Sequence, residues 1–278
     1  MTPALSLTLL AYAIFITSTA AHAQLTDEVP FITTPDNVTL EMLNSAGVKR
    51  GDHVIDLGSG DGRIVITAAK RFEATGLGVE IDPRLVEASN TSARNAGVAA
   101  KVEFRVQDLF KTDLSAATVI TMYLLPEFNL QLRPAILALK PGTRIVSHDW
   151  DMGDWLPDRT TVLPVPDKVV GRDKSSKVHL WTVPARVEGL WCASGLLRGA
   201  SLRLSQKYQA FEGTLAWRDR TRPLAGLISG TELRTPAGSS GELVLQAVDN
   251  VLRITSARGN LALAQGQTFT RTAGASCS

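Results

Sequence analysis

The stretch VIDLGSGDGRIV, residues 54–65, is the key to the fold, because it predicts a buried strand that runs through a glycine turn into a helix. Gly58, Gly60 and Gly62 allow a left-handed backbone and the close approach of a ligand. The helix that follows points its free N–H groups at the same place. Such turns serve several nucleotide cofactors, so the neighbouring residues must decide what this one holds.

Apolar strands and amphipathic helices alternate around this turn. Before it, Thr34 is expected to cap a helix with Pro35 at its first position and a stop at Gly47. Strands are predicted at 53–57, 76–81, 101–106, 118–124 and 143–149, with helices after Gly62 and at 83–96 and 127–139. This order predicts a parallel, doubly wound α/β sheet with ligands at the carboxyl ends of its strands. Two later candidates, 160–165 and 177–183, predict a hairpin-like edge.

The composition changes near Pro184. Residues 1–184 hold 18 Lys and Arg against 21 Asp and Glu, whereas residues 185–278 hold 11 against 6. The later part consists of short alternating runs at 201–209, 211–219, 224–230, 241–249, 250–257 and 260–269, with a hairpin loop predicted at 236–241. We therefore expect an α/β domain over 24–184 and a small antiparallel β module, a barrel or sandwich, over 185–278.

The basic excess of this module fits an envelope or membrane surface, but no interleaving of aromatic and basic residues is recognised, so a solvated surface is favoured and no nucleic acid is expected. Cys192 and Cys277 either form one bridge that fastens the C-terminus or remain two separate thiols.

The first 23 residues differ from the rest, because they contain no Lys, Arg, Asp or Glu, and His22 is their only side chain that titrates near neutral pH. A long apolar run ends in Ala21-His22-Ala23, the small-x-small pattern of a signal peptide, although the start lacks Lys and Arg. We expect cleavage after Ala23 and export, to the periplasm; the alternative is an uncleaved membrane anchor.

Acidic side chains stand at the ends of the first three predicted strands. A carboxylate at Asp56 would repel a pyrophosphate but suits an ammonium or sulfonium ligand. Glu80 can accept both hydroxyls of a ribose, and Asp108 can accept from the exocyclic amine of adenine. Apolar faces for such a ring come from Ile81, Leu109 and Phe110. Asp82 is an alternative ribose ligand, but we expect it to cap the helix that begins at Pro83.

These motifs carry a resemblance. DLGSGDG at 56–62, VEID at 79–82 and QDLF at 107–110 resemble the S-adenosylmethionine site of class I methyltransferases. Within that group, PFITTPDNV, DLGSGDGRIV, YLLPE and LKPGTRIV are similar to the seven-strand lysine methyltransferases whose mitochondrial members modify the ATP synthase c subunit and the adenine nucleotide translocase. The similarity covers about residues 30–150 and includes neither the N-terminal segment nor the β module.

The resemblance implies a Rossmann-like doubly wound sheet of seven strands with an antiparallel last strand, and S-adenosylmethionine as the cofactor. Around the methionine part of the cofactor it places Asp56, Gly58 and Gly60; it assigns the ribose to Glu80 and the adenine to Asp108, Ile81 and Leu109. It implies that Thr33, Thr34 and Pro35 close over the cofactor, and that the methyl-acceptor channel is walled by Tyr123, Leu124 and Pro126. Tyr123 and Pro126 are thus the candidate catalytic residues.

Methyl transfer is an in-line displacement, so the protein must mainly align the reactants and exclude water. Tyr123 is expected to hydrogen-bond an unprotonated amine acceptor, although it also fits as plain aromatic packing. Neighbours along a strand point to opposite faces, so His148 and Asp149 are not expected to act as a pair. His53 and His179 are interpreted as strand starts far from the ligand edge, and no spacing of His and Cys fits a metal site.

Three functions compete. The first is methyl transfer to a protein lysine or another amine. The second is an NAD-binding oxidoreductase, which the GSGDG spacing and Asp56 disfavour. The third is an exported, non-catalytic binding or adaptor protein that retains the fold, because the cofactor is made in the cytosol and an exported enzyme needs a supply. The intact acidic positions favour the first.

Overall fold

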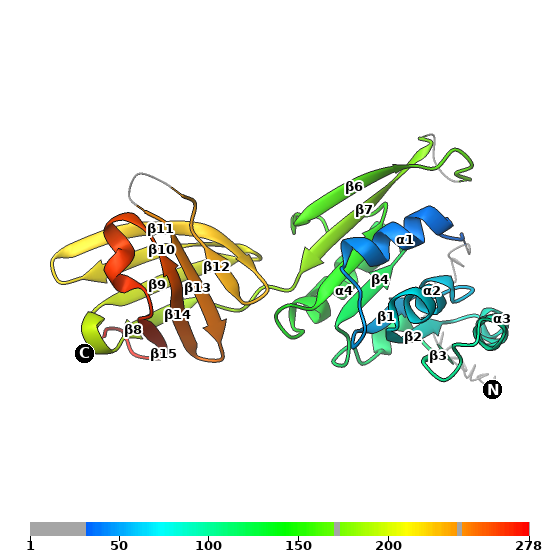
Figure 1. Ribbon diagram of the computed structural model, residues 1–278, viewed down its shortest axis with the longest axis horizontal. Coiled ribbons are helices and arrows are strands. Elements are labelled where there is room, and N and C mark those ends of the chain that lie inside the picture. Colours follow the sequence, from blue (N-terminus) through cyan, green and yellow to red (C-terminus); the bar gives the residue numbers. More distant parts are fainter. Residues whose placement is uncertain (1–31, 170–172, 238–240, 278) are drawn as a thin grey trace, which may run out of the picture. The chain divides into compact units, whose positions relative to one another are not determined.

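The computed structural model describes residues 32–169, 173–237 and 241–277 (Figure 1). Its first part is a seven-stranded sheet of order β3-β2-β1-β4-β5-β7-β6, in which β7 runs antiparallel to both β5 and β6. The elements are α1 (Asp36–Ser45), β1 (His53–Leu57), α2 (Arg63–Phe72), β2 (Thr75–Glu80), α3 (Pro83–Asn95), β3 (Val102–Val106), β4 (Val119–Met122), α4 (Pro126–Leu137), β5 (Arg144–His148), β6 (Arg159–Pro164) and β7 (Ser175–Thr182). The predicted doubly wound sheet and its antiparallel edge are confirmed.

Two apolar layers cover the sheet. On one face, Val38 and Met42 of α1 and Ile64 of α2 pack against alternate residues of β1, β4 and β5. On the other face, Leu132 and Ile136 of α4 pack with the intervening residues of the same strands. Because successive side chains of a strand point to opposite faces, both sets are apolar and the strands are nearly continuous hydrophobic runs. The carboxyl ends of the parallel strands β1 to β5 therefore lie along one edge.

The start of α1 differs from the sequence prediction. The helix begins at Asp36, and its N-cap is Pro35, which has extended backbone and makes no side-chain capping bond. Thr34 therefore does not cap the helix; its hydroxyl lies 3.3 Å from Nδ1 of His148. The helix ends as expected, at Ser45, shortly before the left-handed Gly47.

The second part is a closed antiparallel barrel of order β10-β11-β12-β13-β14-β15-β8-β9. Its strands are β8 (Gly189–Ala193), β9 (Ser201–Lys207), β10 (Ala210–Trp217), β11 (Arg220–Ser229), β12 (Glu232–Arg234), β13 (Leu243–Val248), β14 (Val251–Ala257) and β15 (Thr268–Thr272). Inward-facing side chains fill it, among them the fully buried Trp191 and Phe269. Closure leaves the sheet with no free edge, which confirms the all-β module.

Three details of the barrel were not predicted. The run 260–269 is not one strand: the 3-10 helix η3 (Gly259–Ala264) precedes β15. Gly259 and Gly266, both left-handed, bound this turn, so the apparent Leu-Ala alternation does not continue into a strand. Strands β8 and β12 also lay outside the predicted runs. The expected loop at 236–241 joins the antiparallel strands β12 and β13, but residues 238–240 lie outside the described part.

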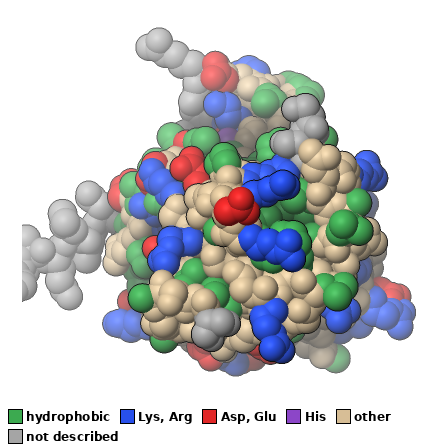
Figure 2. Space-filling view, turned by 90° about the vertical axis from the view of Figure 1, so that its left-hand side faces the viewer, with side chains coloured by type: hydrophobic (Ala, Val, Ile, Leu, Met, Phe, Trp, Pro, Cys, Tyr) green, Lys and Arg blue, Asp and Glu red, His purple; other side chains and the backbone are tan. Residues whose placement is uncertain are grey.

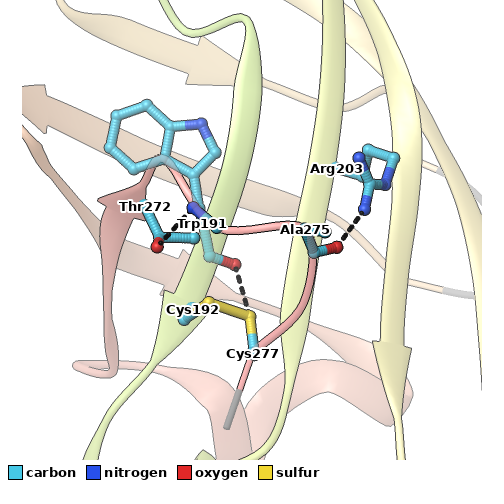
Figure 3. The surroundings of a disulfide bond; sticks show 7 residues. Trp191, Cys192, Arg203, Thr272, Ala275 and Cys277 are labelled. Atoms are coloured by element: carbon cyan, nitrogen blue, oxygen red, sulfur yellow. Dashed lines mark hydrogen bonds between the residues drawn. A yellow bond between two sulfur atoms is a disulfide. The ribbon is translucent and has the colours of Figure 1, made fainter.

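A disulfide fastens the C-terminal segment to the barrel (Figure 3). Cys277 pairs with Cys192 of β8, across 85 positions of sequence. Nearby, Arg203 of β9 donates to the carbonyl of Ala275 at 3.0 Å, as the dashed line in Figure 3 shows. Of the two alternatives open from the sequence, the structure has the bridge.

One hairpin of the barrel contacts the sheet domain. Tyr208, in the turn between β9 and β10, stacks on Trp155 with ring centroids 6.0 Å apart. Its hydroxyl donates to Asp154 at 2.9 Å, and the guanidinium of Arg133 lies 5.5 Å from its ring. Hydrogen bonds from Tyr208, Lys207 and Arg133 stabilise the carboxylate of Asp154 and lower its pKa to about 2.

The predicted signal segment, residues 1–23, lies outside the described residues. Among the helices of the described residues, none has the length and apolar character needed to cross a membrane.

Candidate functional site

The glycine turn after β1 has the backbone that its sequence predicts. Gly58, Gly60 and Gly62 all have positive φ, at 74°, 53° and 77°. The N–H groups of Gly58 and Ser59 donate to the carbonyl of Val79 on β2, which ties the turn to the neighbouring strand. The turn is therefore held at the edge where the parallel strands end.

Asp56 is a buried carboxyl directly before this turn. It is 2% exposed, and its Oδ1 accepts a 2.7 Å hydrogen bond from the hydroxyl of Thr121, its register partner on β4. Burial raises the pKa of Asp56 to about 7, and the carboxylates of Asp61 and Glu80 contribute to the rise. No described cation forms an ion pair with it. The site therefore holds a carboxyl that a cationic ligand would help to ionise.

Glu80, at the end of β2, is clamped by backbone N–H groups. Its Oε2 accepts from Gly60 at 2.9 Å, and its Oε1 accepts from Ile81 and Asp82 at 2.8 and 3.1 Å. These bonds fix the carboxylate beside the glycine turn. Because a carboxylate has about four acceptor positions and these bonds use three, it can still accept from one ribose hydroxyl. Asp82 caps α3 by accepting from the N–H of Arg84 at 2.8 Å, as expected.

Asp108 follows β3 at the same edge. It caps the 3-10 helix η1 (Leu109–Lys111) by accepting from the N–H of Phe110 at 2.9 Å. Ile81 is 70% exposed and Phe110 is 38% exposed. The three adjacent strands β1, β2 and β3 thus bring the three predicted acids, with exposed apolar side chains, to one edge of the sheet.

Tyr123 follows β4 and stacks against His148 at the end of β5. Their ring centroids lie 3.9 Å apart. Burial and the nearby Asp149 carboxylate raise the pKa of Tyr123, so its phenol is neutral at pH 7. Pro126 is the first residue of α4, three residues further on. Both candidate catalytic residues therefore lie at the carboxyl end of β4, next in the sheet to β1.

His148 links several segments of the site. It is 1% exposed, with Nδ1 3.3 Å from the Thr34 hydroxyl and Nε2 2.9 Å from the Ser176 hydroxyl on β7. Burial lowers its pKa to about 4, so the ring is neutral at pH 7. It joins the segment before α1 to the tyrosine that walls the expected acceptor channel.

The expectation that His148 and Asp149 point apart is wrong. Nε2 of His148 lies 3.5 Å from Oδ2 of Asp149. The strand ends at His148, and Asp149 turns back with a φ of 63°, so the alternation of a strand no longer applies. Asp149 also pairs with Lys168 at 2.7 Å. His179 lies inside β7 rather than at a strand start, with Nε2 3.3 Å from the Asp149 carbonyl.

Two residues of the site were missed. Thr121 is the only hydroxyl in β4, and its register beside Asp56 follows from the parallel pairing. Arg63 donates to the Thr34 carbonyl at 2.9 Å and pairs with Asp61 at 2.6 Å, which ties the segment before α1 to the glycine turn. The signal for Arg63 was the charge pair within GDGR. Among the described residues, no cluster of His, Cys, Asp and Glu fits a metal ion.

Known proteins match the part of the chain that holds this site. A family model described as the ANTKMT methyltransferase domain matches residues 56–159. A protein-lysine N-methyltransferase of Saccharolobus islandicus is 42% identical over 131 residues, 46% of this chain and 81% of that protein. A lysine N-methyltransferase of Mus musculus, named for the C subunit of ATP synthase, is 33% identical over 135 residues, 48% of this chain and 53% of that protein.

Among solved structures, an RNA methyltransferase from Salinibacter ruber in complex with S-adenosyl-L-homocysteine is 48% identical, with a TM-score of 0.51. It matches 56% of this chain and 96% of its own. The chain thus spans most of the archaeal relative but only about half of the mouse one.

This strand order, with these acids beside a left-handed glycine turn, defines a class I S-adenosylmethionine-dependent methyltransferase. More narrowly, the chain belongs to the methyltransferase family that contains the lysine N-methyltransferases just described. The residues fit this cofactor, because Asp56 is buried without a cationic partner among the described side chains and S-adenosylmethionine carries both an ammonium and a sulfonium group.

Proposed function

We propose that this protein transfers the methyl group of S-adenosylmethionine to the side-chain amine of a protein lysine. The observation that carries the proposal is the 42% identity to a protein-lysine N-methyltransferase over 131 residues. The methyltransferase family model matches residues 56–159, which include Asp56, Glu80 and Tyr123. The non-catalytic adaptor and the NAD-dependent oxidoreductase are not favoured, because the acidic positions are intact and the family is one of methyltransferases.

The bound cofactor supplies an electrophilic methyl group on a sulfonium sulfur. With the cofactor bound, Asp56 would face its cationic charge, Glu80 would accept from a ribose hydroxyl, and Asp108 with Ile81 and Leu109 would receive the adenine. Tyr123 orients the amine: its neutral phenol oxygen accepts from an amine N–H and directs the nitrogen lone pair. Because the phenol is neutral and His148 is buried, neither acts as a strong base, so the lysine must arrive as the free amine.

A transfer assay tests the proposal. The protein is incubated with methyl-labelled S-adenosylmethionine and a cell extract, and the product is digested with either proteinase or ribonuclease. We expect label that survives ribonuclease, is lost with proteinase, and appears as methyl-lysine after hydrolysis. The matched control is Glu80→Ala, which should lose the label at low cofactor concentration. Label in RNA would contradict the lysine assignment, and it is a necessary comparison because the similar Salinibacter protein is described as an RNA methyltransferase.

We also propose that the protein is exported, with cleavage after Ala23, and works in the periplasm. The apolar N-terminal run and the Cys192–Cys277 bridge support this location, because disulfides persist in oxidising compartments. An envelope or membrane contact through the barrel belongs to the same proposal. N-terminal sequencing of the protein from fractionated cells tests it: a mature chain starting at Gln24 is expected, whereas an intact Met1 in the membrane fraction would indicate the uncleaved anchor.

A further inference from the structure

Three connections of the barrel lie at one of its ends. They join β8 to β9, β10 to β11 and β14 to β15, and the antiparallel registers place them side by side. The N–H of Ser194, after β8, donates to the carbonyl of Thr268 at the start of β15. The 3-10 helices η2 (Gly195–Leu197) and η3 therefore lie on neighbouring connections. We call this surface the loop end of the barrel.

Two leucines of the loop end point into solvent. Leu196 of η2 is 82% exposed and Leu263 of η3 is 92% exposed. In each helix another leucine, Leu197 or Leu261, packs inward against the barrel core. Each short helix is thus anchored by one leucine and presents a second one outward. Among the large apolar side chains of the described residues only Val169 is comparably exposed, and it lies outside the barrel.

Arginines lie on the same end of the barrel as these leucines. Arg198 follows η2, Arg218 and Arg220 lie in the β10–β11 connection, and all three are exposed. The guanidinium of Arg218 lies 4.7 Å from the ring centroid of Trp217, which is itself 37% exposed. Figure 2, which looks at this side of the molecule, shows Lys and Arg side chains spread between hydrophobic ones, with few acidic side chains among them.

The acidic residues of the loop end are few. Asp219 sits between Arg218 and Arg220 in sequence. Glu242, at the start of β13, pairs with Arg234 at 2.9 Å and lies 3.8 Å from Arg258. The exposed arginines at 198, 218 and 220 therefore outnumber the one exposed acid beside them, so the surface has a positive excess.

We propose that the loop end of the barrel docks on an anionic lipid bilayer, with Leu196 and Leu263 entering the boundary between headgroups and acyl chains. Exposed aliphatic side chains gain free energy on leaving water, and arginines at the same end are attracted to anionic headgroups. A nucleic acid fits less well: single strands stack on open aromatic faces, whereas Arg218 lies over Trp217 and the most exposed side chains are aliphatic.

The opposite end of the barrel remains available for its contact with the sheet domain. Tyr208 lies in the connection between β9 and β10, at the other end of these strands, and packs against Trp155. Lipid binding at the loop end therefore does not compete with this contact. The surface went unrecognised in the sequence because its residues come from separate connections and only the fold brings them together.

Vesicle sedimentation tests the proposal. Residues 24–278 are used, because they are the proposed mature chain and the apolar N-terminal run would bind lipid on its own. The protein is mixed with vesicles of phosphatidylcholine alone or with vesicles that contain about one third phosphatidylglycerol. The second kind carries the anionic headgroups that attract arginine. We expect binding at least about tenfold stronger to the anionic vesicles, weakening as salt is raised.

Two paired variants separate the contributions. Leu196→Ser with Leu263→Ser should weaken binding by about tenfold or more, and Arg218→Gln with Arg220→Gln should abolish the preference for anionic lipid. The matched control is Leu227→Ser with Arg253→Gln, two exposed residues on the barrel wall, which should bind like the parent.

Circular dichroism melting checks that every variant is folded. Equal binding by all variants, or no binding by the folded parent, would overturn the proposal. The proposal would also be overturned if a single-stranded polynucleotide displaced the protein from the vesicles while the leucine variant bound like the parent. Those two results together would identify a nucleic-acid surface.

Discussion

The affinity for S-adenosylmethionine should fall as pH drops below 7, and replacing Asp56 by asparagine should remove this dependence. Asp56 has a pKa of about 7 because it is buried beside two other carboxylates. A cationic ligand binds the ionised form, so the apparent association constant follows the ionised fraction. That fraction is about one half at pH 7 and about 3% at pH 5.5, which makes the constant about 16-fold smaller, or about 1.6 kcal/mol.

Calorimetric titration at pH 5.5, 6.2 and 7 measures this change. His148, with a pKa of about 4, stays neutral over the range. The Asp56→Asn variant should bind S-adenosylmethionine more weakly than the parent at pH 7, and its affinity should hardly change between pH 5.5 and 7. Titration with S-adenosylhomocysteine, which lacks the sulfonium charge, identifies the group that Asp56 meets. If its association constant depends on pH as strongly as that of S-adenosylmethionine, Asp56 meets the ammonium group; a weaker pH dependence indicates the sulfonium. A parent affinity that stays constant from pH 5.5 to 7 would show that Asp56 does not meet the cationic part of the cofactor.

The same shift has a consequence for stability without ligand. In the unfolded chain Asp56 loses its proton near its ordinary pKa of 3.8, whereas in the folded protein it keeps the proton up to about pH 7. The free energy of unfolding therefore falls as pH rises from about 4 through 7. Asp56→Asn should therefore melt at a higher temperature than the parent at pH 8, with little difference at pH 4.

Other predictions follow from single contacts. Tyr123→Phe should lower kcat by about 10- to 100-fold with an unchanged cofactor Kd, because only the acceptor loses its partner; a parallel loss of cofactor binding in calorimetry would contradict this. Glu80→Ala should weaken cofactor binding by about 1–3 kcal/mol through the lost ribose bond, and an unchanged Kd would rule out that role. Gly62→Ala should cost about 2–4 kcal/mol in urea unfolding, because its Cβ would lie 2.7 Å from the ring of Phe104 at a φ of +77°; a neutral change would contradict the turn geometry. Replacing Cys192 and Cys277 together by Ala should lower unfolding free energy by about 2–5 kcal/mol, and equal melting of the oxidised and variant proteins would show that the bridge contributes nothing.

The sheet was predictable because its signals are local. A buried strand, a glycine turn and an amphipathic helix repeat along the chain, and parallel pairing then fixes where Asp56, Glu80 and Asp108 lie. Asp82 as a helix cap follows from the same kind of signal, an acid directly before Pro83. Such features depend on residues close in sequence, and the structure confirms the doubly wound sheet that they predict.

Long-range contacts were not predictable in the same way. The stacking of Tyr123 on His148 depends on β4 and β5 being neighbours and on the left-handed turn at Asp149, which a strand pattern does not reveal. Thr34 was expected to cap a helix because its local sequence suits a cap, but its hydroxyl faces His148, which lies 114 positions away. In the barrel, the Leu-Ala alternation of η3 resembled a strand, although flanking left-handed glycines turn it into a helical connection.

Titration of the protein with S-adenosylmethionine, with NAD as the control, is the decisive measurement for the cofactor site. We expect one binding site for S-adenosylmethionine, loss of affinity in Glu80→Ala, and no heat from NAD at the same concentrations. Binding of NAD, or the absence of S-adenosylmethionine binding to the folded protein at pH 7, would contradict the assignment of the glycine turn and its three acids to the methyl donor.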